Sequence, residues 1–526
     1  MLMKRLLIAC GILGIIAGLI CRVTLLTTSF EYDELFTAVT SNPAVAFDYI
    51  WKHYLIVDVH PPLYNCLLWL YNHLVPYGPE WILRLPSLLF SLLGLVLAWS
   101  LFPRYLLRIT RWIFVLLLSC NFYLLLYAQQ ARSYSLMLCL SIVLTFLYLN
   151  IARCISHHRP VPTKWWVAYA ICSLLLCWSH YFGALLFGLF SVILGINAWN
   201  EKQPLRPTVI TTLLVLIGFS PWLVPNLIEN LSQSRFSGNW WGNSPLSWKL
   251  VRLWIEFFFS SLKIFYVLSL LILAGGFYSF WRWRVQKIWP FKREMVLLLL
   301  PMVTAGTFTL LMSIKIFWLI WRYFTPFVPC LYLFVALLIT PLCKRYCIAL
   351  LLFLCFVWFS FQLFIGIHPY FELGYYFPAR GAMEIYQQAF PDKDLYVVAM
   401  EAFPPESLPK MYAFYPHHYF HMNRPVYELL SMEETQRNEL LARQENALMW
   451  MPNCEKRKLQ QLAKILQRDI SLFAQFSTNC YIIPAKEHSN SINHAQYVDY
   501  ARRFENYRKR YLTEYIINSL SHQSDK

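Results

Sequence analysis

Two adjacent carboxylates, Asp33 and Glu34, follow the first long apolar stretch of the chain. An ionised side chain is costly beside hydrocarbon, so a carboxylate pair at this boundary indicates a functional or a local structural role. Neighbouring negative charges raise the pKa of one carboxyl group, which suits a general base that works near neutral pH. The alternatives are a cation ligand and an acidic pair at the positive end of a helix dipole.

A second polar block, Asp58-Val59-His60-Pro61-Pro62-Leu63-Tyr64, precedes the apolar residues 67–70. The two prolines restrict the backbone to an extended form, so they would hold Asp58 and His60 in fixed positions. A polar side chain at such a place is often only a satisfied hydrogen-bonding group. The combination of an acid, a histidine and two prolines in one short loop points to a binding or catalytic site.

Three later blocks each place a polar residue beside aromatic residues at the end of an apolar stretch. Arg132 could anchor to lipid headgroups or bind a phosphate with two parallel hydrogen bonds. His180 and Arg322, taken singly, fit an aromatic belt with a polar anchor. Together with the acidic blocks, they predict a site for an amphiphilic substrate that carries phosphate. The three blocks are Tyr127 to Ser135, Ser179 to Gly183 and Arg322 to Pro326.

The composition indicates an integral membrane protein. Of 526 residues, 58% are hydrophobic and only 14% are charged, whereas soluble domains average about 25% charged residues. The net charge of +17 comes mostly from short basic loops, so nucleic-acid binding is disfavoured. Most of the 14 cysteines lie in apolar stretches as small buried side chains without zinc-ligand spacing. Cys454 and Cys480, in the polar C-terminal part, could form a disulfide or stay reduced.

The apolar stretches predict about eleven membrane spans. The first follows Lys4 and Arg5 like a signal peptide but lacks a cleavage motif, so an uncleaved span is expected. The positive-inside rule places the N-terminus and the basic loops in the cytoplasm, and the acidic and aromatic blocks on the opposite face. The spans are expected near residues 1–26, 82–102, 112–128, 134–152, 165–179, 182–199, 208–228, 262–280, 295–313, 323–341 and 347–367.

An odd number of spans places residues 368–526 outside the cytoplasm, where strand-like runs alternate with polar helical stretches. We therefore expect a mainly α polytopic membrane protein with a small C-terminal α/β extracytoplasmic domain. Its domains are residues 1–367, with a first outer loop at 27–81, and residues 368–526, with a basic aromatic helix near 494–519. The strand-like runs are residues 394–400, 447–451 and 479–484.

The polar blocks resemble those of the family 39 type of membrane glycosyltransferases, which have the C-type architecture. This group includes the dolichyl-phosphate-mannose protein mannosyltransferases and the bacterial lipid A aminoarabinose transferase. The resemblance spans roughly residues 30–330 and rests on the order and spacing of several short motifs. These motifs are Tyr32-Asp33-Glu34, His60-Pro61-Pro62-Leu63-Tyr64, Leu83-Arg84-Leu85-Pro86-Ser87, Gln129 to Ser135, His180-Tyr181-Phe182-Gly183 and Arg322-Tyr323.

The resemblance implies an inverting enzyme that moves a sugar from a polyprenyl phosphate to an acceptor at the outer face of the cytoplasmic (inner) membrane. It implies that Asp33 is the general base and that Glu34 supports it. A phosphate leaving group needs no general acid, so one carboxylate and a cationic cradle suffice. The implied phosphate ligands are His60, Arg132 and Arg322, Tyr64 and Tyr134 would line the site, and the other substrate-binding candidates are Asp58, Gln130, His180, Tyr181 and Tyr323.

Bacterial relatives usually carry a glutamate where this chain has Gln130, so no charged role is carried over to that position. The sugar, the polyprenyl length and the acceptor, a glycolipid or a protein, are left open. Asp33 and Asp58 could together hold a divalent cation. The alternative function is a transporter or flippase of lipid-linked sugars. Transporters place ionisable groups near mid-membrane and often contain repeats, whereas here these groups gather at one face, which favours the enzyme.

Overall fold

The computed structural model describes the transmembrane part of the chain with short gaps and the C-terminal part in pieces. The chain divides into two compact units, each of which is described by itself. The first comprises Met1–Thr24, Phe47–Leu68 and Arg84–Phe364, and the second comprises Leu25–Ala46, Trp69–Leu83 and Ile365–Lys526. The described residues are 2–28, 30–102, 106–232, 248–286, 293–313, 320–345, 358, 395–398, 426–428, 432–442, 447–450, 460, 464, 474–477 and 480–483.

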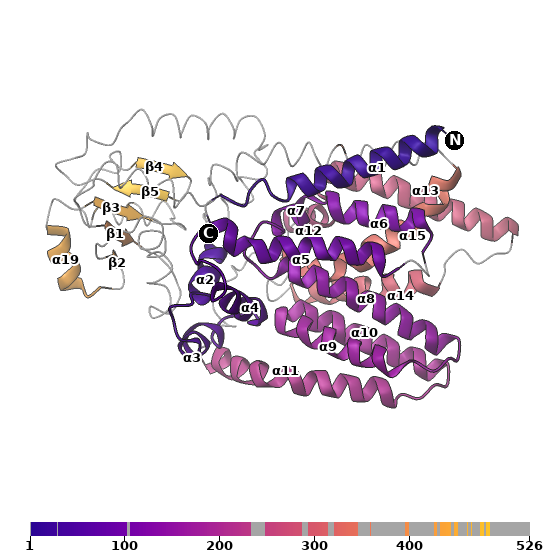
Figure 1. Cartoon of the computed structure of the whole chain (residues 1–526), viewed down its shortest axis with the longest axis horizontal. Coiled ribbons are helices and arrows are strands. Elements are labelled where there is room, and N and C mark those ends of the chain that lie inside the picture. The colour runs from indigo at the N-terminus through magenta and orange to yellow at the C-terminus, as the bar shows by residue number, and fades with distance from the viewer. Residues whose placement is uncertain are drawn as a thin grey trace. The chain divides into compact units, whose positions relative to one another are not determined.

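The first unit is a bundle of long helices around a large apolar core (Figure 1). Within it α8 packs against α9 and α10, α9 packs against α11, and α15 packs against α6, α13 and α14. The helices up to residue 345 are α1 (Leu2–Cys21), α2 (Tyr32–Thr40), α3 (Phe47–Ile50), η1 (Trp51–Leu55), α4 (Leu63–Asn72), α5 (Glu80–Ser100), α6 (Arg108–Cys120), α7 (Phe122–Tyr127), α8 (Tyr134–Ser156), α9 (Thr163–Ser179), α10 (Tyr181–Asn200), α11 (Arg206–Ser232), α12 (Trp248–Phe259), α13 (Leu262–Gln286), α14 (Arg293–Met312), η3 (Trp321–Phe327) and α15 (Val328–Arg345).

Seven of the described helices are long and apolar enough to cross a membrane, which makes the chain a multi-pass membrane protein. Their outward faces carry exposed apolar side chains such as Leu214 and Ile217 of α11, as lipid contact requires. The total of eleven spans stays a prediction, because the expected span at 347–367 lies almost wholly outside the described residues. The seven are Glu80–Ser100, Tyr134–Ser156, Tyr181–Asn200, Arg206–Glu229, Leu262–Trp281, Arg293–Met312 and Trp321–Leu342.

A buried arginine joins α1 to α5 and α6. Arg22 is 0% exposed, and its Nη1 donates to the carbonyls of Gly18 and Ser119 at 2.9 and 2.8 Å. Its Nη2 donates to the carbonyl of Leu118 at 3.0 Å, and its Nε donates to the hydroxyl of Ser91 at 3.0 Å. These bonds fix the relative positions of three helices.

In the second unit, the short helix α2 begins with a capping box. The backbone N–H of Glu31 donates to Oε2 of Glu34 at 3.0 Å, and the Glu31 side chain caps the helix in return. At the other end of α2, the hydroxyl of Tyr77 donates to the carbonyl of Ala38 at 2.7 Å. Both ends of the helix that carries the acidic pair are therefore held by side chains.

The C-terminal part of the second unit contains a five-stranded mixed sheet in the order β2-β1-β3-β5-β4. Strand β1 pairs in parallel with β2 and β3, whereas β5 pairs antiparallel with β3 and β4. Three of the strands, β1, β3 and β5, fall within the runs expected from the sequence to be strands. The elements described here are β1 (Leu395–Val398), β2 (Val426–Glu428), α19 (Glu434–Ala442), β3 (Ala447–Trp450), β4 (Ala474–Ser477) and β5 (Cys480–Ile483).

Much of the C-terminal part lies outside the described residues, including Cys454 and the expected basic helix near 494–519. The α/β domain as a whole and its boundary at 367/368 therefore stay predictions, as does the disulfide with Cys480.

Candidate functional site

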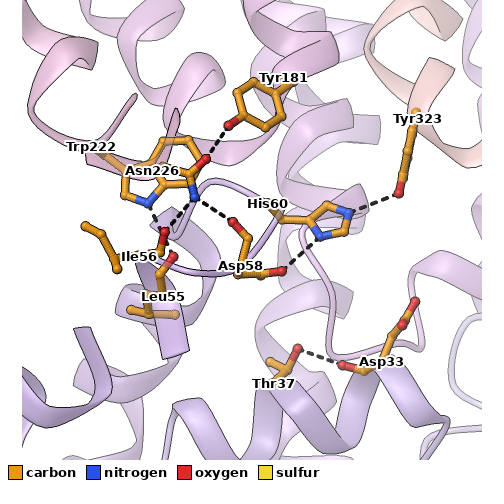
Figure 2. Close-up of polar contacts among 10 residues, drawn as sticks. All are labelled: Asp33, Thr37, Leu55, Ile56, Asp58, His60, Tyr181, Trp222, Asn226 and Tyr323. Atoms are coloured by element: carbon orange, nitrogen blue, oxygen red, sulfur yellow. Dashed lines mark hydrogen bonds and ion pairs between the residues drawn. The ribbon is translucent and has the colours of Figure 1, made fainter. Parts of the chain in front are cut away.

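The loop between η1 and α4 carries Asp58 and His60, and it ends with Pro61 and Pro62. The Nδ1 atom of His60 lies 3.5 Å from Oδ1 of Asp58, at the outer limit of a hydrogen bond. The Nε2 atom of His60 lies 3.2 Å from the hydroxyl oxygen of Tyr323 (Figure 2). A carboxylate beside Nδ1 favours the tautomer with the proton on that nitrogen, which leaves Nε2 to accept from the tyrosine hydroxyl.

Tyr323 brings a third segment to this point. It belongs to η3, a short 3₁₀ helix that continues directly into α15. Its ring centroid lies 4.5 Å from that of His180 and 5.7 Å, edge-on, from that of His60. The two histidine rings are 5.3 Å apart. Residues 60, 180 and 323, which the sequence marks only as separate polar positions at helix ends, thus pack into one cluster.

His180 presents a hydrogen-bond donor inside this cluster. It is the N-cap of α10, it is 2% exposed, and its Nδ1 accepts from the backbone N–H of Phe182 at 3.1 Å. That bond places the ring proton on Nε2. In the part of the chain that the structure describes, this buried Nε2 has no hydrogen-bond partner. A buried donor left unmatched costs about 1–3 kcal/mol, so this position suits an acceptor atom that none of the described residues supplies.

Two arginines give the cluster a positive charge. Arg132 is buried in the turn before α8, and the guanidinium carbon of Arg322 lies 5.9 Å from the ring centre of Tyr134. Burial holds the pKa of His180 well below its usual 6.5, and His60, Arg132 and Arg322 lower it further. The His180 imidazole is therefore neutral near pH 7, and its N–H is an uncharged donor in a positive environment.

Tyr64 supports the turn that carries Arg132. Its hydroxyl oxygen lies 2.6 Å from Oγ of Ser87, and that serine donates to the backbone carbonyl of Arg132 at 3.1 Å. Since the single proton of the serine hydroxyl goes to the carbonyl, Tyr64 must be the donor in the shorter bond. The Tyr64 hydroxyl thus holds the backbone at Arg132.

The glutamine pair before Arg132 divides between two environments. Gln130 is half-buried, and its backbone carbonyl accepts from the Arg132 N–H at 2.8 Å. Gln129 is buried, and its amide donates to the carbonyls of Cys21 and Leu125 at 2.9 and 3.1 Å. The side chain of Gln129 therefore joins this turn to the end of α1.

Tyr181, the first residue of α10, connects that helix to α11. Its hydroxyl donates to Oδ1 of Asn226 at 2.7 Å, and the Asn226 amide donates to the carbonyls of Ile56 and Asp58 (Figure 2). Asn226 and its neighbour Trp222 were not among the site residues predicted from the sequence. A signal for both was present, because residues four positions apart share one face of a helix and an asparagine is unusual in an apolar span.

The acidic pair belongs to the second unit. Glu34 is 0% exposed, and its carboxylate accepts the Glu31 backbone N–H of the capping box. This is the helix-start role that the sequence left open as an alternative. Asp33 is half-buried in the first turn of α2, and its backbone carbonyl accepts from the hydroxyl of Thr37 at 3.2 Å. Of the two, Asp33 is the better candidate for a general base.

The structure gathers seven of the predicted site residues within the first unit. Tyr64, Gln130 and Tyr181 have the supporting contacts given above, and Asp33 and Glu34 lie in the second unit. Over the described ranges, no group of three or more His, Cys, Asp or Glu is arranged to hold a metal ion. A divalent cation between Asp33 and Asp58 stays a prediction. The seven gathered residues are Asp58, His60, Arg132, Tyr134, His180, Arg322 and Tyr323.

No protein-family model matches the chain, and no curated protein sequence matches it. The fold is similar to that of ArnT from Cupriavidus metallidurans. Against its apo structure the TM-score is 0.53 at 13% identity, with 90% of this chain and 97% of that chain covered. Against its structure bound to undecaprenyl phosphate the TM-score is again 0.53 at 13% identity, with 91% and 98% covered.

The archaeal oligosaccharyltransferase AglB from Archaeoglobus fulgidus, solved with an inhibitory peptide and a dolichol-phosphate, gives a TM-score of 0.45 at 12% identity, with 91% of this chain and 74% of that chain covered. The similarity to ArnT establishes the fold. The C-type membrane glycosyltransferase architecture expected from the sequence motifs is therefore confirmed at the level of the fold.

Proposed function

We propose that this protein is a membrane glycosyltransferase that moves a sugar from a polyprenyl-phosphate donor to an acceptor at the outer face of the cytoplasmic membrane. The observation that carries the proposal is the buried Nε2–H of His180, which faces no acceptor among the described residues and lies within the electrostatic influence of Arg132 and Arg322. A phosphate group supplies several acceptor oxygens and negative charge, so it matches both the His180 N–H and the two arginines.

The cluster is suited to the leaving group of the reaction. A sugar linked to polyprenyl phosphate is a phosphodiester with one negative charge, and the departing polyprenyl phosphate gains a second charge. Arg132 and Arg322 would interact more strongly with the developing charge than with the bound donor, which lowers the barrier. The Nε2–H of His180 would add an uncharged donor. The phosphate therefore leaves without a general acid.

Asp33 is proposed as the general base. An acceptor hydroxyl transfers its proton to the Asp33 carboxylate while its oxygen forms a bond to the anomeric carbon. The bond between that carbon and the phosphate oxygen breaks, and the phosphate keeps the electron pair. One direct displacement of this kind inverts the anomeric centre. Glu34, which is held in the capping box of α2, would support the position of Asp33.

The acceptor is proposed to be a glycolipid or a protein in the cell envelope, reached from the face where the polar blocks of the sequence gather. Solved ArnT binds undecaprenyl phosphate, which makes that lipid a suitable probe for this chain. The C-terminal residues 368–526 are proposed to form an extracytoplasmic domain, and the N-terminus is proposed to be cytoplasmic on the basis of the basic loops.

Binding to the purified protein in lipid nanodiscs tests the phosphate site. Native mass spectrometry would compare undecaprenyl phosphate with undecaprenol, which has the same chain without the phosphate. We expect the wild type to prefer the phosphate at least tenfold, and we expect Arg322→Ala to remove most of that preference. Equal binding of the two lipids by the wild type would contradict the proposal. A flippase would also bind the phosphate, so the formation of a glycosylated product separates the two functions.

A further inference from the structure

A buried asparagine in α11 holds the loop that carries Asp58 and His60. Asn226 is 0% exposed, and its Nδ2 donates to the carbonyls of Ile56 and Asp58, each at 2.7 Å. Its Oδ1 accepts the hydroxyl of Tyr181, also at 2.7 Å. Figure 2 shows this amide between the tyrosine and the loop. Short bonds on both ends of the amide fix its orientation.

Trp222 adds a contact from the same face of α11. Its indole is 0% exposed, and its Nε1 lies 3.5 Å from the carbonyl of Leu55, the last residue of η1. The Trp222 ring packs against the ring of Tyr181, with centroids 5.6 Å apart. Residues 222 and 226 are one helical turn apart, so one face of α11 contacts three nearby backbone carbonyls. These belong to residues 55, 56 and 58.

These contacts end two residues before His60, and the rigid Pro61-Pro62 pair begins one residue after it. The His60 backbone is therefore fixed from both sides. The position of its imidazole between Asp58 and Tyr323 depends on that backbone, because a loop without such anchors would sample other conformations. If an apolar side chain replaced the Asn226 amide, the carbonyls of Ile56 and Asp58 would lose these hydrogen bonds.

We infer that Asn226 is a positioning residue: its amide sets the backbone of residues 56–58 so that His60 holds the Tyr323 hydroxyl within the cluster proposed to bind the donor phosphate. The inference rests on the proposed function for the phosphate, while the anchoring of the loop rests on the contacts alone. Asn226 touches no reacting atom in this account. It acts through His60, and Tyr181 acts through Asn226.

The test uses Asn226→Leu, which keeps the size and removes both donors, and Tyr181→Phe, which removes only the bond to Oδ1. The matched control is Asn197→Leu. Asn197 is also buried, and its amide donates to the carbonyl of Ala152 at 3.1 Å, but it lies at the other end of α10 from His180. Hydrogen exchange of the loop peptide at residues 50–60 and the dissociation constant for undecaprenyl phosphate are measured for each protein in nanodiscs.

We expect Asn226→Leu to speed hydrogen exchange of the loop peptide at least tenfold. We also expect it to raise the dissociation constant for undecaprenyl phosphate at least tenfold. Tyr181→Phe should give smaller changes in the same direction, which keeps the test open if the leucine variant folds poorly. Asn197→Leu should leave both quantities unchanged. In a His60→Ala background, Asn226→Leu should weaken binding less than twofold further, because its effect passes through the lost imidazole.

Unchanged exchange at residues 50–60 in both variants would overturn the inference, and so would a full additional loss of binding in the His60→Ala background. Failure of the proposed function has a different signature. In that case the wild type binds undecaprenyl phosphate and undecaprenol equally, while the exchange measurement still decides whether Asn226 orders the loop.

Discussion

The Nε2 atom of His60 and the hydroxyl oxygen of Tyr323 lie 3.2 Å apart, although the two residues are 263 positions apart in the sequence. The bond joins the loop before α4 to the 3₁₀ turn before α15. His180, at the start of α10, packs against both rings. Three loops are therefore held together by one histidine pair and one tyrosine, with Arg132 and Arg322 adding positive charge around them.

Replacing Tyr323 with phenylalanine tests the role of its hydroxyl. The variant keeps the ring contacts with both histidines but removes the bond to His60. Because one hydrogen bond contributes about 0.5–1.5 kcal/mol, we expect the affinity for undecaprenyl phosphate to fall by roughly tenfold at most. The unfolding midpoint should change little. Titration of wild type and variant in nanodiscs measures the effect, and an unchanged affinity would remove the hydroxyl from the site.

Replacing His180 with asparagine separates its two hydrogen-bonding atoms. Asparagine is a good N-cap residue, so its side-chain oxygen can still accept the Phe182 backbone N–H. The Nε2–H donor is lost. We expect binding of undecaprenyl phosphate to weaken by roughly tenfold, which corresponds to about 1.4 kcal/mol, while the protein stays folded. If the variant binds the lipid as tightly as the wild type does, the buried donor does not meet the phosphate.

The depressed pKa of His180 predicts a pH dependence of stability. The unfolded state binds a proton on this residue below about pH 6.5, whereas the folded state stays neutral to a lower pH. The free energy of unfolding of the wild type should therefore fall below that pH, by up to about 1.4 kcal/mol per pH unit from this residue. His180→Asn should lack this contribution. Unfolding midpoints between pH 7.5 and 5 that change in parallel for the two proteins would contradict the prediction.

Arg22 is expected to contribute to stability without contributing to substrate binding. Arg22→Met would leave the carbonyls of Leu118 and Ser119 without the partners that the guanidinium supplies. We expect a loss of about 2–4 kcal/mol of stability and an unchanged affinity for undecaprenyl phosphate. Arg111→Met is a matched control, because Arg111 makes one longer bond of 3.3 Å to the carbonyl of Trp99. Equal destabilisation by both substitutions would contradict this role.

The sequence predicted the helical architecture because hydrocarbon imposes a strict requirement on composition and length. It also marked Asp58, His60, Arg132, His180 and Arg322 as individual polar positions. It did not show that His60 and His180 would touch, since contacts between loops far apart in the chain depend on how the helices pack. The resemblance to known glycosyltransferases supplied the grouping that residue types alone could not.

The supporting residues were harder to predict than the site itself. Asn226 lies in an apolar span without a local motif, and it holds the loop through backbone carbonyls, which no side-chain pattern reveals. Tyr64 and Gln130 were selected from a motif, yet the Tyr64 hydroxyl donates to Ser87 and the buried glutamine of the pair is Gln129. Within the acidic pair, the capping box distinguishes Glu34 from Asp33.

Sugar transfer with Asp33 as the base is tested most directly by mass spectrometry of polyprenyl-phosphate sugars and envelope glycans in cells that lack this protein. The cells are complemented with the wild type or with Asp33→Asn, both checked for equal membrane expression. We predict that one lipid-linked sugar accumulates, that one glycan lacks that sugar, and that only the wild type restores both. If Asp33→Asn restores both as well as the wild type does, Asp33 is not the base and the transporter becomes the better account.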